Sequence, residues 1–279
     1  MDKQIENNGI TRILNGKYGH YVYNRNDVNI AQFLEMYGEY SDGEVRLFDA
    51  ILRQGDHAID IGANCGALTL PMAQIVGMYG IVYAFEPQQP IFQTLCATMA
   101  LNNIINVQCF PFAVSDTDGY GSLPNIDYSK PGGFGSAQIS KDSPDESYIK
   151  IKTVKLDTFL SHIGRLDFIK IDVEGMEGDV VNGATKLINK FRPFMYIEND
   201  KEDRYQDLIL LVQSLGYSVY WHVPRMFNPD NYAGNNEDIK IVSFNMICVP
   251  NECSPLPGCK KITNPNYHPL FNKENFENA

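Results

Sequence analysis

Residues 57–66 read HAIDIGANCG, an apolar run that ends in a turn with glycines at positions 62 and 66. Helical patterns of apolar residues alternate with such runs along the chain, and runs that are apolar almost throughout are typical of strands covered on both faces. The other runs span 80–86, 106–114, 166–172 and 193–198, and the helical patterns span 66–76, 88–102, 177–190 and 203–215. The sequence therefore predicts an α/β fold with a doubly wound, mostly parallel sheet.

Two further apolar runs, at residues 217–223 and 238–249, follow the last helical pattern closely. Such a pair commonly adds an antiparallel hairpin at the edge of a sheet, which gives seven strands in all. Residues 117–147 are rich in Gly and Ser, and we expect a loop there that forms a lid or rim of the site. Its Tyr128, Phe134 and Ser136 are available to a polar ligand.

The chain before the first strand has a hairpin pattern at residues 17–27 and then an S-x-x-E helix start at Ser41 and Glu44. We expect three parts: residues 1–55 as an N-terminal hairpin and helix that cover the site, 56–249 as the main α/β domain, and 250–279 as an irregular tail rich in Pro and Asn.

Charge limits the partners. The 279 residues hold 23 Lys plus Arg against 34 Asp plus Glu, a net charge of −11, without a basic cluster beyond Lys260 and Lys261. This argues against nucleic acid and anionic membranes as partners and leaves a small molecule.

The six cysteines form no C-x-x-C pair, so we expect reduced thiols. The opening residues and the rest of the chain lack an apolar segment of about 18 residues, and we expect a cytoplasmic protein.

The ends of the predicted strands carry the candidate ligand site, because ligands of open α/β sheets bind there. The end of the first strand and the turn after it contain Asp60, Gly62, Asn64 and Gly66. The second ends at Glu86, about twenty residues further on, where an acid accepts the hydroxyls of a ribose. The turn lacks the G-x-G-x-x-G pattern that holds a pyrophosphate, so the sequence favours a nucleoside without phosphates over the NAD of an oxidoreductase.

Four segments in the correct order make the resemblance specific: residues 58–73 (AIDIGANCGALTLPMA), 84–87 (AFEP), 112–116 (FAVSD) and 167–184 (DFIKIDVEGMEGDVVNGA). They resemble the FkbM family of S-adenosylmethionine-dependent methyltransferases over about residues 36–200. The resemblance implies a class I methyltransferase fold, which is Rossmann-like, and methylation of hydroxyls of sugars, glycans or other small metabolites.

The resemblance also assigns cofactor-binding residues. The loop beside the methionine part of the cofactor matches Asp60, Gly62, Asn64, Gly66 and Thr69, the ribose-binding acid matches Glu86, and the adenine edge matches Ala113 and Val114; Tyr37, Ser41 and Glu44 lie in a segment like one that covers the cofactor. Three of these residues also have a purely structural interpretation: Asn64 as the cap of the helix, Asp60 as an acceptor for the amides of the turn, and Thr69 as a residue that faces the core.

Methyl transfer to a hydroxyl needs alignment of donor and acceptor and removal of a proton. At the ends of the later strands, Asp172 is the first candidate for the base or the hydroxyl acceptor, His222 the second, and Glu198 a further acid. For His222, a packed edge-strand histidine is the alternative. Asp172, Glu198 and Asn199 also offer a set of oxygen ligands for Mg²⁺, although Glu198 stands where the D…DN set of metal-dependent O-methyltransferases has Asp.

Two other functions stay open from the sequence. N-methylation of a small amine would depend less on a base, and replacement of Asp172 and His222 would then leave much activity. The second alternative function is that of a protein that binds a nucleoside but catalyses no reaction.

Overall fold

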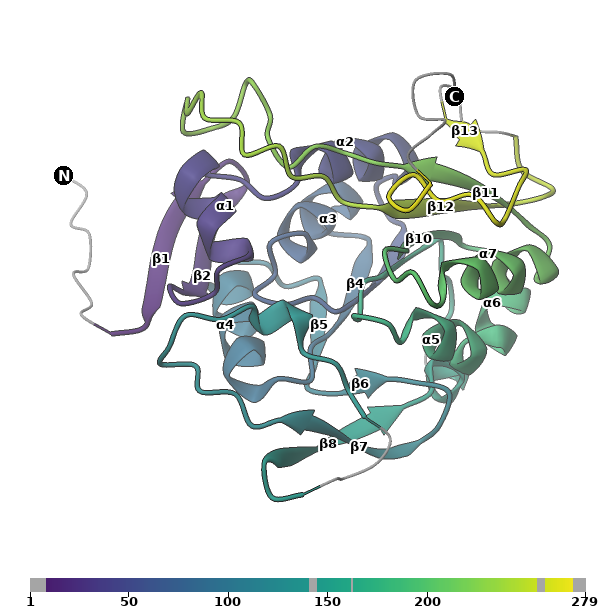
Figure 1. Ribbon diagram of the computed structural model, residues 1–279, viewed down its shortest axis with the longest axis horizontal. Coiled ribbons are helices and arrows are strands. Elements are labelled where there is room, and N and C mark those ends of the chain that lie inside the picture. The colour runs from purple at the N-terminus through teal and green to yellow at the C-terminus, as the bar shows by residue number, and fades with distance from the viewer. Residues whose placement is uncertain (1–8, 141–144, 162, 255–258, 273–279) are drawn as a thin grey trace.

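A mostly parallel sheet forms the centre of the computed structural model, which describes residues 9–140, 145–161, 163–254 and 259–272. Its eight strands run in the order β13-β11-β12-β10-β9-β3-β4-β5 (Figure 1). The bounds are β3 His57–Ile61, β4 Ile81–Phe85, β5 Val107–Phe110, β9 Phe168–Ile171, β10 Phe194–Glu198, β11 Tyr217–His222, β12 Asn245–Pro250 and β13 Lys260–Lys261.

Strands β5, β4, β3, β9 and β10 are parallel, and β12 pairs antiparallel with both β10 and β11. The predicted seven strands and their edge hairpin are confirmed. The short strand β13 is an addition within the predicted tail, and it pairs antiparallel with β11. The last predicted strand, at 238–249, begins too early, because residues 238–244 lie outside the sheet.

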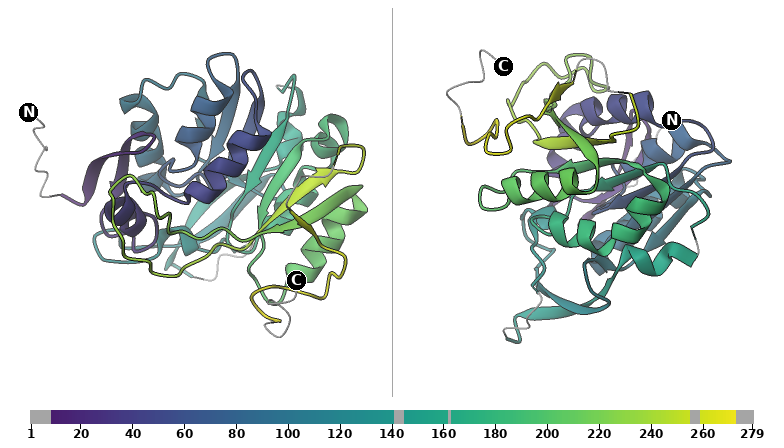
Figure 2. Two further views of the ribbon diagram at one scale, coloured as in Figure 1. Left: turned by 90° about the horizontal axis from the view of Figure 1, so that it is seen from above. Right: turned by 90° about the vertical axis from the view of Figure 1, so that its right-hand side faces the viewer.

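Helices cover both faces of the sheet, as apolar strands require. The helices are α1 Ile30–Tyr37, α2 Asp42–Ile51, α3 Thr69–Val76, α4 Gln89–Leu101, α5 Glu177–Gly183, α6 Thr185–Phe191 and α7 Tyr205–Ser214. Buried residues of α5, α6 and α7 pack with the sheet in one core cluster, and those of α2 and α3 pack in another. Figure 2 shows the green helices and the purple and blue helices on opposite faces. The predicted helix at 177–190 is two helices, and α1 was not predicted.

Two small sheets flank the central one. The N-terminal hairpin joins β1 Thr11–Gly16 to β2 Gly19–Asn24, so it begins earlier than the predicted segment 17–27. Strands β6 Ala113–Val114, β7 Gly119–Pro124 and β8 Tyr148–Val154 form a three-stranded sheet in the order β6-β8-β7. The predicted strand 106–114 is therefore divided between two sheets. The predicted loop 117–147 holds β7 and the short helix η1 Phe134–Ser136, while its residues 141–144 lie outside the described residues.

The segment between β11 and β12, residues 223–244, leaves the sheet and runs over α2 to α1 before it returns (Figure 1). We call it the strap. A bridge between Arg225 and Val242 joins its two ends, and Tyr37 of α1 donates its hydroxyl to the carbonyl of Glu237 at 2.7 Å. The strap therefore connects the N-terminal region to the end of the sheet where the parallel strands finish.

Candidate active site

A cavity of about 270 Å³ lies at the carboxyl ends of β3, β4, β9 and β10. This is the position that the topology of an open α/β sheet predicts for a ligand. Its polar lining is dominated by acids, with one lysine, Lys170, among the described residues. The carboxylates are Glu44, Glu86, Asp172, Glu174, Glu198 and Asp200. The cavity therefore favours a positively charged ligand.

The turn after β3 forms the first wall. Gly62 has φ of 79°, and a Cβ at this position would overlap the carbonyl oxygen of Asp172. Only glycine fits there. Asn64 also has a positive φ of 47°, and its side-chain oxygen accepts from the amide of Cys65 at 2.7 Å. Gly62 and Asn64 both line the cavity, as predicted.

Glu86, at the end of β4, faces the same wall. Its two carboxylate oxygens accept backbone amides, one from Asn64 at 3.1 Å and the other from Gln88 at 2.8 Å. Its side chain is buried, and burial raises the pKa of Glu86 to about 7. A carboxylate fixed in this way at the edge of the cavity has the position that a ribose-binding acid requires.

Lys170 of β9 is the site residue that the sequence analysis missed. Its ammonium lies 3.2 Å from Asp60 Oδ1 and 3.4 Å from Asp172 Oδ2, and the residue is only 2% exposed. Burial alone would lower the pKa of Lys170, but the carboxylates of Asp60, Asp172 and Glu44 outweigh it and raise the pKa. The available signal was a lysine in the apolar strand FIKI, on the same face as Asp172 two residues later.

Asp60 and Thr69 belong to the support of this lysine. The Thr69 hydroxyl donates to Asp60 Oδ2 at 2.6 Å, and both side chains are fully buried behind the cavity. Gly66, with φ of 86°, packs against Leu95 and Met99 of α4. These three residues were predicted to contact the cofactor. They lie outside the residues that line the cavity, and their contact with the cofactor stays a prediction.

The second wall carries the acids that follow β9 and β10. Lys201 pairs with Glu174 at 2.7 Å and with Asp200 at 2.8 Å. Glu198 lies among these groups, and its buried Oε2 atom has no hydrogen-bond partner among the described residues. Burial and the charges of Asp172, Asp200 and Glu174 raise the pKa of Glu198 well above its ordinary value.

Several predicted residues lie outside the lining. Tyr37 bonds the strap, Ser41 begins α2 without a side-chain capping bond, and Ala113 and Val114 are buried in β6. Glu44, from the same predicted segment as Ser41, does line the cavity, and burial raises its pKa to about 7. The adenine contacts of Ala113 and Val114 remain a prediction.

His222 is a correction to the predicted bases. Its Nδ1 atom is hydrogen-bonded to the Tyr196 hydroxyl at 2.8 Å, and it is absent from the lining. Burial lowers the pKa of His222 to about 4. The alternative of a packed edge-strand histidine describes it better.

Asn199 corrects the predicted metal set. Its amide nitrogen donates to the Tyr205 carbonyl at 3.2 Å and contacts Met246 sulfur at 3.1 Å, so Asn199 does not join Asp172 and Glu198 in the lining. Within the described part of the chain, no three His, Cys, Asp or Glu side chains form a group suited to a metal ion. No helix there is long and apolar enough to cross a membrane.

Apolar residues of α1 and the strap also line the cavity. They are Ile30, Phe33, Met226, Ile241, Val242 and Phe244.

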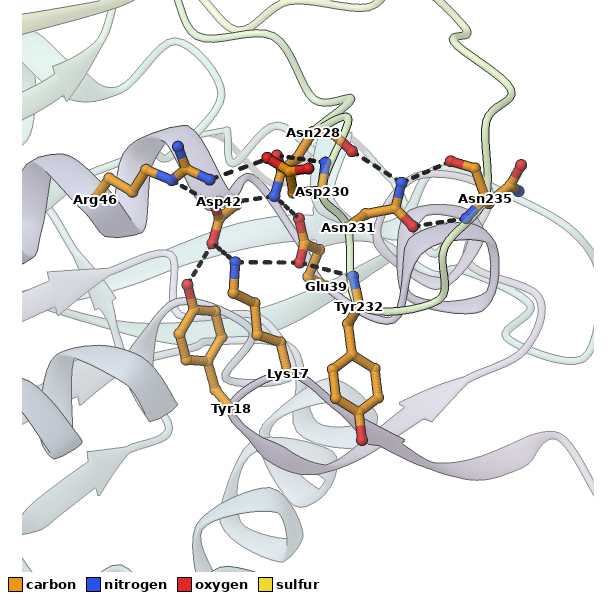
Figure 3. Close-up of polar contacts among 10 residues, drawn as sticks. All are labelled: Lys17, Tyr18, Glu39, Asp42, Arg46, Asn228, Asp230, Asn231, Tyr232 and Asn235. Atoms are coloured by element: carbon orange, nitrogen blue, oxygen red, sulfur yellow. Dashed lines mark hydrogen bonds and ion pairs between the residues drawn. The ribbon is translucent and has the colours of Figure 1, made fainter.

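Figure 3 shows the contacts that hold the strap. Asn228 donates to the buried carboxylates of Glu39 at 2.8 Å and Asp42 at 3.2 Å, and Asp42 also pairs with Lys17 and Arg46. On the other side, Gly135 of the predicted rim loop reaches the cavity, while Phe134 packs on Tyr128.

The sheet order, the glycine turn beside a ribose-type acid and the cation-attracting cavity define a nucleoside-dependent enzyme of the class I methyltransferase type. Residues 60–219 match the model of the methyltransferase FkbM domain, and the chain belongs to this family. It is an S-adenosylmethionine-dependent methyltransferase.

The individual proteins that this chain resembles have low sequence identity to it. Methyltransferase 1 of Beauveria bassiana is 26% identical over 197 residues, which cover 62% of this chain and 76% of that protein. The 23S rRNA (uracil(1939)-C(5))-methyltransferase RlmD of Acinetobacter baumannii is 27% identical over 97 residues, 33% of this chain and 21% of that protein. The crystal structure of methyltransferase FkbM from Methylobacillus flagellatus has a TM-score of 0.47 and 16% identity, with 71% of this chain and 45% of that chain covered.

The residues of the cavity fit the cofactor. Glu86 offers a fixed carboxylate for ribose hydroxyls, and Gly62 allows the turn after β3 to pack against the Asp172 carbonyl at the edge of the cavity. The excess of carboxylates suits a sulfonium cation. Gly62, Asn64, Glu86 and Glu44 are the predicted cofactor residues that line the cavity.

Proposed function

We propose that the protein methylates a hydroxyl group of a sugar, glycan or other small metabolite, with Glu198 as the base. One observation carries the proposal: the Oε2 atom of Glu198 is buried at the cavity and lacks a hydrogen-bond partner among the described residues. A carboxylate whose pKa is raised takes a proton from a hydroxyl more readily than an exposed one does.

The remaining residues bind and orient. When bound, S-adenosylmethionine supplies an electrophilic methyl group for an in-line displacement. In this proposal Glu86 binds the ribose, and the turn at Gly62 and Asn64 holds the methionine part. Asp172, which is ion-paired with Lys170, accepts a hydrogen bond from the substrate and positions it. Glu198 then receives the hydroxyl proton.

N-methylation of a small amine is the second candidate, because six carboxylates around the cavity attract a cationic acceptor. The net charge of −11 favours a small acceptor over a nucleic acid. We infer no metal in either reaction scheme, since Asn199 faces Tyr205 and Met246.

The experiment is a screen with methyl-labelled S-adenosylmethionine against glycosides, amino sugars, nucleotide sugars and simple amines, with mass spectrometry to locate the methyl group. Label on oxygen supports the proposal, and label on nitrogen contradicts it. With the acceptor found, Glu198→Gln is expected to lower kcat by about 100-fold or more, as loss of a base does. His222→Phe serves as the comparison and is expected to retain most of the activity. If Glu198→Gln retained most of the activity and His222→Phe lost it, His222 would be the base.

A further inference from the structure

The acceptor side of the cavity has more negative than positive charge. Glu174, Glu198 and Asp200 lie together, and Lys201 is the ammonium that pairs with two of them. Lys170 is occupied on the other side by Asp60 and Asp172. The charge of Lys201 also acts on Glu198, but the ion pairs of Lys201 are with Glu174 and Asp200. Three carboxyl groups in this part of the cavity therefore share one ammonium.

The position of Glu198 makes this imbalance specific. Its Oε2 atom is buried, unbonded to the described residues and at the cavity surface. A buried polar atom is ordinarily satisfied, and an exception inside a cavity indicates a ligand group that completes it. Burial and the charges of three nearby carboxylates raise the pKa of Glu198, which favours its protonated form in the free protein. A protonated carboxyl is unable to act as the base.

We propose that the acceptor carries a protonated amine close to the hydroxyl that is methylated, and that this ammonium binds between Glu198 and Asp200. The bound ammonium compensates the carboxylates and keeps Glu198 ionised, ready to take the hydroxyl proton. The substrate class is an amino sugar or an amino alcohol. This inference rests on the proposed function, since it uses the same site and the same base.

The apolar part of the lining favours an organic cation over a metal ion. Phe33, Met226, Ile241 and Phe244 line the same cavity as the acids, and they offer apolar surface to a ring or carbon chain. In the described residues, no three acidic, His or Cys side chains are arranged for a metal. An ammonium group on a partly apolar scaffold suits both the acidic and the apolar residues of the lining.

Calorimetry with matched probes tests the inference. The protein is first saturated with S-adenosylhomocysteine, and the heat of its binding verifies that the cofactor site is intact. Glucosamine is then compared with glucose, and trans-2-aminocyclohexanol with trans-1,2-cyclohexanediol. The amine member of at least one pair is expected to bind about tenfold or more tightly than its hydroxyl counterpart.

Variants locate the effect. Glu198→Gln and Asp200→Asn are each expected to remove the preference while S-adenosylhomocysteine still binds, and Glu202→Gln, an exposed acid nearby in the chain, is expected to keep it. Equal affinity within both pairs, no binding of either amine, or a preference that persists in both variants would overturn the inference. Binding of Mg²⁺ in place of the amines would also overturn it. Failure of S-adenosylhomocysteine to bind would instead contradict the proposed function.

Discussion

The ammonium of Lys170 in β9 lies 3.4 Å from the carboxylate of Asp172, which directly follows the end of this strand. Alternate residues of a strand share a face, so this spacing directs both side chains to the cavity end of β9. The neighbouring strand β3 supplies Asp60 from the other side at 3.2 Å. Lys170 therefore joins the structural layer behind the cavity to the groups that line it.

Replacement of Lys170 by Met is expected to destabilise the protein by about 3 kcal/mol or more, because it removes the buried cationic partner of Asp60 and Asp172. Urea unfolding followed by circular dichroism measures this difference. Lys186→Met, at an exposed position of α6, is the control and is expected to change stability by less than about 0.5 kcal/mol. Equal stability of the two variants would show that the pairs of Lys170 contribute nothing.

Stability is expected to depend on pH through Glu86. Its pKa is about 7 in the folded chain, above its ordinary value of 4.5, so the folded chain binds this proton more tightly than the unfolded chain. The stabilising effect of this proton is complete at pH values below the ordinary pKa. It is lost as the pH rises through about 7.

The free energy of unfolding of the cofactor-free wild type is therefore expected to decrease between about pH 5.5 and pH 8 relative to Glu86→Gln, in which the group does not titrate. Urea titrations of both proteins at the two pH values measure this. Identical pH dependence of the two would contradict the assignment of a buried, protonated Glu86.

Asn228→Ala is expected to loosen the strap. The change removes a donor from the buried carboxylates of Glu39 and Asp42, which costs about 1–3 kcal/mol. Limited proteolysis is expected to cut faster within residues 229–240, while the cut rate in Asn236→Ala, an exposed position of the strap, stays at the wild-type value. Unchanged cleavage in Asn228→Ala would mean that other contacts hold the strap.

The sequence predicted where the central strands lie along the chain, because their apolar runs and the turn residues are local signals. Gly62, Asn64 and Glu86 were predicted for the same reason, since they lie within three residues of the ends of β3 and β4. Lys170 was missed, because a lysine in a strand is buried only when another strand supplies its partner, here Asp60, which is distant in sequence.

The strap and α1 escaped prediction for a related reason. Residues 238–244 have an apolar pattern that resembles a strand, but the contacts of Asn228 with Glu39, 189 residues away, hold the segment above the sheet. Asp60 and Thr69 are hydrogen-bonded to each other behind the cavity, and their contact with the cofactor stays a prediction. Sequence position alone does not separate a residue that lines a cavity from one that supports it.

Calorimetric titration with S-adenosylmethionine, S-adenosylhomocysteine and NAD tests the central claim most directly, because it needs no knowledge of the acceptor. The account predicts that the first two bind to the wild type and that NAD does not. It also predicts that Glu86→Ala weakens the binding of both by more than about tenfold, while Glu202→Ala has no effect. Binding of NAD alone, or undiminished binding of S-adenosylmethionine to Glu86→Ala, would contradict the cofactor site described above.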